Sequence, residues 1–173
     1  MAYPSFRRVV TGHSSSGRAI ITNDDTLYPG DFFVPSERAQ EGAFGATFLF
    51  RTTAAPESNN APFEDPANKS QPISEAVSSN WRIIDFPPNS TAPFHRTLSV
   101  DFGVVIKGEV VIELEDGVET VLKEQDGVVQ RGTVHAWHNR TAENARMIFV
   151  ILPAEPVKVE ETGEILKERQ IGE

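Results

Sequence analysis

The stretch PFHRTLSVDFGVVIKG, residues 93–108, decides the fold. Its second half, residues 102–106, is apolar and β-branched and is followed by Gly108, a pattern typical of a strand that ends in a turn. Further short runs of this character lie at residues 81–86, 109–114, 119–122, 128–130, 135–138 and 146–152. The Asp116-Gly117 pair between two of them is a strong hairpin signal. Short strands at regular spacing predict a closed all-β fold with few helices.

The flanking sequence predicts one domain with four parts. Residues 7–11 and 18–22 are β-prone and enclose a polar loop, which indicates an N-terminal hairpin, and residues 44–52 indicate another strand. We expect N-terminal strands packing on the barrel (1–52), a Pro/Ser/Asn-rich loop (53–80), the barrel core (81–152) and a charged C-terminal tail (153–173). The loop is either a lid or disordered, with a short helix at 73–79, and the tail wraps the barrel or forms a short helix.

Composition excludes several kinds of chemistry. The 173 residues carry a net charge of −9 and no cysteine, so disulfides, thiolate metal sites and cysteine nucleophiles are excluded. Acidic chains are repelled by phosphate backbones and anionic lipids, which disfavours nucleic-acid and membrane partners. The first ten residues lack the apolar run of a secretory signal, and no stretch approaches the ~20 apolar residues of a spanning helix. We therefore expect a cytoplasmic location.

Two histidines and one aspartate are the candidates for catalysis. Asp101 lies six residues after His95, so the two side chains share a face if one unbroken strand connects them. His135 follows beyond two hairpin turns and can be brought next to them in a barrel. Two imidazoles and a carboxylate could hold a divalent metal or exchange protons. The alternative is that these are satisfied structural groups, with Asp101 paired to a neighbouring arginine.

The sequence resembles the cupin family at both of its motifs. His95, Thr97, Asp101 and Gly108 match the spacing of the first motif, and Gly132, His135 and Asn139 match the second. The resemblance implies a cupin barrel, that is, a double-stranded β-helix or jelly roll. Metal-binding cupins usually offer three histidines and a glutamate, whereas here Thr97 and Asp101 occupy two of those positions.

A narrower resemblance concerns small single-domain cupins of bacteria and fungi, some of them encoded beside biosynthetic enzymes. It rests on residues 93–97, 103–105, 129–133 and 135–137 and on the N-terminal residues 8–13. Few members of this subgroup have a firmly known reaction.

Several neighbours of the candidate triad are predicted to line the cavity. We expect Phe94, Thr97 and Trp137 to contact substrate, since Trp137 shares the face of His135. His138 points to the opposite face unless a bulge intervenes, and His13 lies in a polar loop.

Three functions remain open on this basis. The first is an enzyme that acts on a small oxygenated organic molecule, polyketide-like or aromatic, by non-redox proton transfer such as dehydration, decarboxylation, isomerisation or cyclisation. The second is a non-haem metal-dependent oxygenase that uses His95, Asp101 and His135 as ligands. The third is a non-catalytic small-molecule binder. The cofactor is accordingly either absent or one divalent metal, with Fe, Mn, Zn and Ni not distinguished, and an exposed barrel edge predicts a homodimer.

Overall fold

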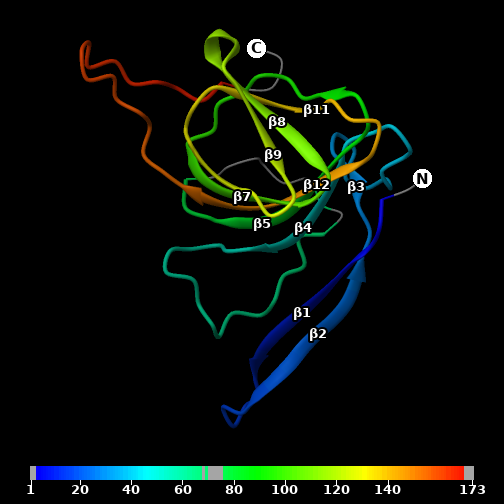
Figure 1. Ribbon diagram of the computed structural model, residues 1–173. Helices are drawn as coiled ribbons and strands as arrows, with labels where there is room; N and C mark the ends of the chain where they lie inside the picture. Colours follow the sequence, from blue (N-terminus) through cyan, green and yellow to red (C-terminus); the bar gives the residue numbers. More distant parts are fainter. Residues whose placement is uncertain (1–2, 68, 70–75, 170–173) are drawn as a thin grey trace.

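Strands form nearly all the regular structure of the protein (Figure 1). The computed structural model describes residues 3–67, 69 and 76–169. Within these ranges the only helical element is the single 3-10 turn Glu115–Gly117. None of the helical structure there is long and apolar enough to cross a bilayer. The prediction of an all-β fold is confirmed.

One wall of the barrel is a six-stranded antiparallel sheet in the order β10-β7-β12-β5-β4-β3. Its strands are β3 (Gly30–Asp31), β4 (Gly45–Arg51), β5 (Asn80–Phe86), β7 (Ser99–Lys107), β10 (Gly127–Arg131) and β12 (Ala145–Pro153). Side chains alternate between the two faces: on β7 Asp101 and Val105 are buried, whereas Phe102 and Ile106 are exposed. Strand β12 lies between β5 and β7, so residues of these three strands form cross-strand rows on the inner face.

The other wall is a four-stranded sheet in the order β6-β11-β8-β9. Its strands are β6 (Ser90–Thr91), β8 (Glu109–Leu114), β9 (Glu119–Lys123) and β11 (His135–Asn139). The turn between β8 and β9 contains Asp116 with φ 62° and Gly117 with φ 75°. Two successive left-handed residues favour Asp-Gly, which explains why this pair marked the hairpin in the sequence.

The core lies between the two sheets and is built from the inner faces of both. Val110, Val105, Met147 and Phe86 are among its most deeply buried members. These side chains come from β8, β7, β12 and β5, so their burial holds the two walls together.

The N-terminal hairpin of β1 (Phe6–His13) and β2 (Ala19–Leu27) differs from the other strands because it extends away from the barrel (Figure 1). Only its base packs on the barrel, where Leu27 forms a small cluster with Leu49 and Ile83. Arg8, buried at this base, pairs with Asp25 and Asp65 and donates to the Leu49 carbonyl, 3.1 Å away. An ion-paired arginine therefore secures the hairpin to the body.

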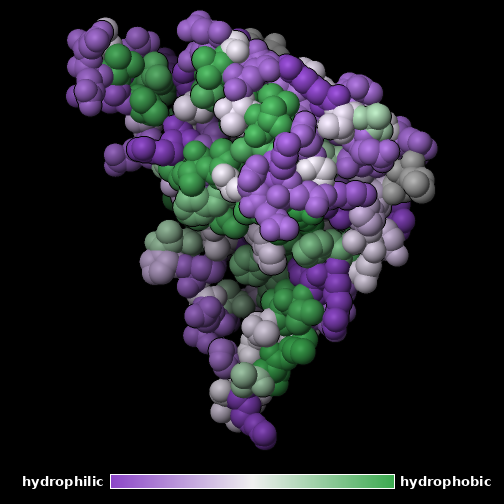
Figure 2. Space-filling model, viewed as in Figure 1, coloured by the Kyte–Doolittle hydropathy of each residue, from purple (hydrophilic) through white to green (hydrophobic). Residues whose placement is uncertain are grey.

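The exposed part of the hairpin is apolar in places. Figure 2 shows apolar surface along it, and Val9, Ile20 and Ile21 are 44%, 43% and 62% exposed. Exposed apolar side chains gathered on a projecting ribbon are typical of a surface that another chain covers.

The described parts of the segment after β4 contain neither strand nor helix. Phe63 stacks on Phe50 with ring centroids 6.0 Å apart, so this segment lies beside the hairpin base. None of its described residues lines the barrel cavity. The helix expected at 73–79 falls partly outside the described residues, and residues 76–79 are not helical.

Candidate functional site

His95 and His135 are brought together by their own backbones. Each backbone N–H donates to the other residue's carbonyl at 3.0 Å, which makes an antiparallel bridge. Directly opposed residues of an antiparallel pair place their side chains on the same face. The two imidazole centroids accordingly lie 4.4 Å apart.

His95 and Asp101 do not lie on one unbroken strand, which was the condition for their sharing a face, because β7 begins only at Ser99. His95 instead pairs with β11, and Asp101 enters the same cavity from the opposite sheet. The spacing that matches the cupin motif thus spans a crossing from one wall to the other.

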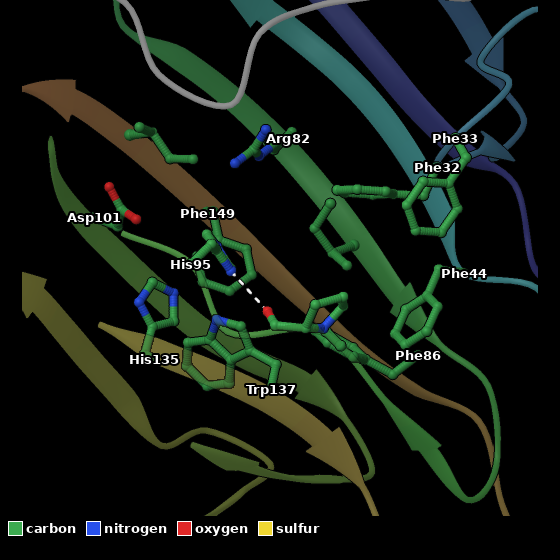
Figure 3. A pocket seen from close by; sticks show the side chains of 14 residues that line it. Phe32, Phe33, Phe44, Arg82, Phe86, His95, Asp101, His135, Trp137 and Phe149 are labelled. Atoms are coloured by element: carbon green, nitrogen blue, oxygen red, sulfur yellow. Dashed lines mark hydrogen bonds between the residues drawn. The ribbon is translucent and has the colours of Figure 1, made fainter. Parts of the chain in front are cut away.

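Backbone carbonyls fix which nitrogen of each imidazole faces the cavity. Nδ1 of His95 lies 3.1 Å from the Pro93 carbonyl (Figure 3), and Nδ1 of His135 lies 3.0 Å from the Thr133 carbonyl. A carbonyl oxygen only accepts hydrogen bonds, so each Nδ1 carries the proton. Nε2 of both rings is therefore left with a lone pair.

Burial keeps both imidazoles uncharged at neutral pH. Burial lowers the pKa of His95, despite its hydrogen bond to the Pro93 carbonyl, and the charge of Arg82 acts in the same direction. Burial, helped by the charge of His95, lowers the pKa of His135 to about 4. Two neutral rings with free Nε2 lone pairs can accept protons or bind a cation.

Asp101 and Arg82 provide the remaining polar groups of the cavity. Asp101 is 6% exposed, and its Oδ1 is buried without a hydrogen-bond partner among the described residues. Burial raises the pKa of its carboxyl despite Ser99 and Arg82 nearby. Arg82 is also 6% exposed, and burial lowers its pKa to about 10, which leaves it charged at neutral pH. Both side chains point into the space in front of the imidazoles (Figure 3).

Apolar side chains make up the rest of the cavity wall. The empty volume is about 660 Å³, including the open mouth. The apolar lining consists of Phe32, Phe33, Phe44, Ile84, Phe86, Ala92, Pro93, Trp137, Phe149 and Ile151. In Figure 3 the four polar side chains gather at one end and Phe32, Phe33, Phe44 and Phe86 at the other. A cavity of this shape suits a small molecule with an apolar body and one polar end.

The other residues predicted to contact substrate are placed differently. Trp137 lines the cavity, with its ring 5.8 Å from that of His135. Phe94 and Thr97 are not among the lining residues, and the Thr97 hydroxyl accepts a 2.8 Å hydrogen bond from Ser99. His138 faces away from the cavity, as strand alternation predicted: its Nε2 lies 2.8 Å from Glu113, and its Nδ1 lies 3.2 Å from the Thr91 hydroxyl.

The sequence as a whole is similar to proteins of known family. A family model described as "Cupin domain" matches residues 82–151. Cupin-domain-containing oxidoreductase virC of Hypocrea virens is 31% identical over 166 residues, which cover 90% of this chain and 81% of the relative. The chain belongs to the cupin family. Oryzines biosynthesis cluster protein J of Aspergillus oryzae is 33% identical to this cupin, over 96% of this chain and 94% of the relative.

Solved structures agree on the fold of this cupin. The cupin domain of Schizosaccharomyces pombe Cnp3 superimposes with a TM-score of 0.50, covering 85% of this chain and 87% of that domain, at 11% sequence identity. At that identity the likeness concerns the fold alone, and it identifies the two walls described above as a double-stranded β-helix barrel.

Cupins often bind a metal, and a metal limits how far apart its ligand atoms can lie. First-row metals sit about 2.0–2.2 Å from nitrogen and oxygen ligands, which places ligand atoms close to one another. Among the described residues, the one cluster of three donor atoms within 4.8 Å is Glu113, Glu119 and His138, not His95, Asp101 and His135. The cavity donors thus do not form a three-ligand site in this geometry. In the Glu113 cluster, His138 is already paired with Glu113, and Glu119 with Arg140.

Sequence reasoning missed Arg82 and the phenylalanines of the cavity mouth. Arg82 lies in an apolar strand, where an arginine usually marks the solvent face. Its neighbour Trp81 is 38% exposed, so the strand presents Arg82 inward and its largest ring outward. Phe32 and Phe33 lie in a turn-rich segment that carried no strand signal. Of the lining residues, the sequence predicted His95, Asp101 and His135 from the cupin motifs and Trp137 from strand alternation.

Proposed function

We propose that this cupin is a biosynthetic enzyme that moves a proton on a small, largely apolar or aromatic metabolite without net redox change. The observation that carries the proposal is the pair of neutral imidazoles with Nε2 lone pairs in an apolar cavity. A positioned imidazole acts as a general base when it is uncharged and within reach of the substrate proton. Dehydration, decarboxylation, isomerisation and cyclisation all require such a base.

The two walls of the cavity supply different groups to this chemistry. His95 removes the proton, and the proton passes to His135 or returns to another atom of the substrate. Asp101 acts as the acid partner, because burial raises the pKa of its carboxyl and so favours the protonated form. The aromatic lining excludes water and strengthens these interactions.

The names of relatives support the biosynthetic part of this proposal. Protein J belongs to the oryzines biosynthesis cluster, and Diaporthe leptostromiformis has a relative called phomopsin biosynthesis cluster protein C', 31% identical over 88% of this chain and 81% of the relative. Clusters of this kind assemble small organic molecules. A cavity with one polar end fits such a substrate.

A metal-dependent oxygenase is the alternative, and the word oxidoreductase in the name of virC favours it. His95, Asp101 and His135 would be the ligands, with Fe, Mn, Zn or Ni as the metal, and the metal would supply the site at which oxygen is activated. The donor atoms are not gathered closely enough for that in this geometry. Metal analysis of protein purified without chelator, paired with oxygen-uptake measurements on candidate metabolites, separates the two functions.

The proposal is tested with 5-nitrobenzisoxazole, a flat neutral probe. When a base removes its carbon-bound proton, the N–O bond breaks and a coloured phenolate nitrile forms, with no oxidant or reductant needed. We expect wild type to accelerate this reaction, and His95→Ala and His135→Ala each to lower kcat/KM by about 10²-fold, the usual contribution of a general base. Wild-type activity should rise with pH below neutrality, as His95 loses its proton, and then level off.

The matched control is His13→Ala, which removes an exposed histidine at the end of β1, outside the cavity. It should react as wild type does. If the double variant lacking both cavity histidines is as active as wild type, the imidazoles are not the base and the proposal fails. A folded double variant, shown by unchanged circular dichroism, makes either result decisive.

We also propose that this cupin forms a homodimer through its projecting hairpin. The exposed apolar side chains of the hairpin support this, as do Phe102 and Ile106, which are 46% and 41% exposed on the outer face of β7. Burying both sets in one contact would remove apolar surface from water.

A further inference from the structure

Arg82 is a buried cation without a partner in the part of the chain that the structure describes. Its side chain lines the cavity, and only 6% of the residue is exposed. Its Nε is buried with no hydrogen-bond partner, and no ion pair within 4.0 Å joins it to a described residue. Its guanidinium carbon lies 5.8 Å from the ring centroid of Phe48.

Such a group is costly to bury unless an anion compensates its charge. Proteins pair buried charges because the loss of hydration outweighs anything that an apolar wall returns. Asp101 is the carboxyl group of the cavity, but burial raises its pKa and strand β12 separates it from Arg82. Arg82 is in register with Phe149 on one side of β12, and Asp101 is in register with Ile151 on the other. The fold therefore leaves the guanidinium aimed into an open cavity.

We infer that Arg82 binds the carboxylate of a small molecule whose apolar body lies along the aromatic part of the cavity. This inference deepens the proposed function by naming the substrate class, and it rests on that function in placing the substrate in this cavity. A guanidinium presents N–H donors in a planar fork that matches a carboxylate. Phe44 and Phe86, at the far end of the cavity, would contact the opposite end of the molecule (Figure 3).

Anchoring the carboxylate at Arg82 also orients the molecule for proton transfer. Arg82 and His95 line the same cavity. A carboxylate held there would place the rest of the molecule in front of the imidazoles, where a base can reach an acidic proton further along it. Arg82 is thus a substrate-binding residue that determines specificity for acids.

The test compares two probes of nearly equal shape, 2-naphthoate and its neutral amide, 2-naphthamide, by isothermal titration calorimetry at neutral pH. We expect wild type to bind the carboxylate at least about tenfold more tightly, as charge-assisted hydrogen bonds from a buried arginine require. Arg82→Met should abolish that preference while leaving the amide affinity within about threefold of wild type. Arg82→Lys keeps the charge but loses the planar fork and should give an intermediate preference.

Arg131→Met is the matched control, because Arg131 is exposed on β10 and does not line the cavity. It should keep the wild-type preference. If wild type binds the amide as tightly as the carboxylate, or binds neither probe, the inference is overturned; the same holds if folded Arg82→Met retains the preference. Should Arg82→Met not fold, the wild-type comparison and Arg82→Lys decide. Binding preference is measured without turnover, so its failure is distinguishable from a failure of proton transfer.

Discussion

Acidification should destabilise this cupin through His135, whose imidazole is buried and uncharged. Its pKa is about 4 in the folded chain, against an ordinary value of 6.5. Between those values the unfolded chain binds a proton that the folded chain does not, so the free energy of unfolding falls as pH falls. His135 therefore leaves the free energy of unfolding almost unchanged above pH 6.5 and lowers it by about 3 kcal/mol once the pH reaches the pKa of the folded chain.

Other buried groups act in the same range, so the measurement must isolate His135. Burial also lowers the pKa of His95, which adds to the loss at low pH. The pKa values of Asp101 and Asp85 are raised by burial, and each then binds a proton more readily in the folded state, which stabilises the fold as pH falls toward 3.8. The quantity to compare is the difference between wild type and His135→Gln, in which these other contributions largely cancel.

The assay is urea unfolding at a series of pH values from 7 to 4. The wild-type free energy of unfolding should fall relative to that of His135→Gln by about 3 kcal/mol across this range. His13→Gln, altered at an exposed histidine, should follow wild type throughout. Parallel curves for wild type and His135→Gln would show that water reaches His135, and the neutral buried base would have to be abandoned.

Two further predictions concern packing and assembly. Gly103→Ala should destabilise the fold by about 1–3 kcal/mol, since its Cβ would lie 2.8 Å from the Phe149 ring of the cavity wall. Gly127→Ala should not, because its Cβ would lie 3.8 Å from the Gly103 carbonyl oxygen; equal melting temperatures of the two variants would contradict this. Ile21→Lys should convert the dimer to a monomer, because a charge would replace a 62% exposed apolar side chain on the hairpin. Light scattering that shows wild type to be monomeric at micromolar concentration would refute the dimer.

The sequence predicted the walls of the barrel better than the contents of its cavity. Alternating side chains and Gly turns located the strands, and the cupin spacing found His95, Asp101 and His135, all of which line the cavity. Thr97 shows the limit of this approach, because it occupies the position of a cupin ligand yet its hydroxyl is engaged by Ser99.

Arg82 could not be found in the same way, because the rule that charges face solvent fails where a ligand or cavity replaces water. Nothing in residues 81–86 distinguishes an inward arginine from an outward one. The mouth of the cavity was missed for a different reason. Phe32 and Phe33 lie where the chain turns, and their contribution depends on long-range packing rather than on local pattern.

His95 pairs with β11 of the smaller sheet, whereas Arg82 and Asp101 belong to the larger sheet. This arrangement has a consequence for how such proteins diversify. The gap between base and anchor depends on the separation of the two walls, which core side chains such as Met147 maintain. Exchanging a core residue for a bulkier or slimmer one would widen or narrow that gap without touching any polar group. Substrate length could then be retuned from inside the hydrophobic interior, while the reacting residues stay as they are.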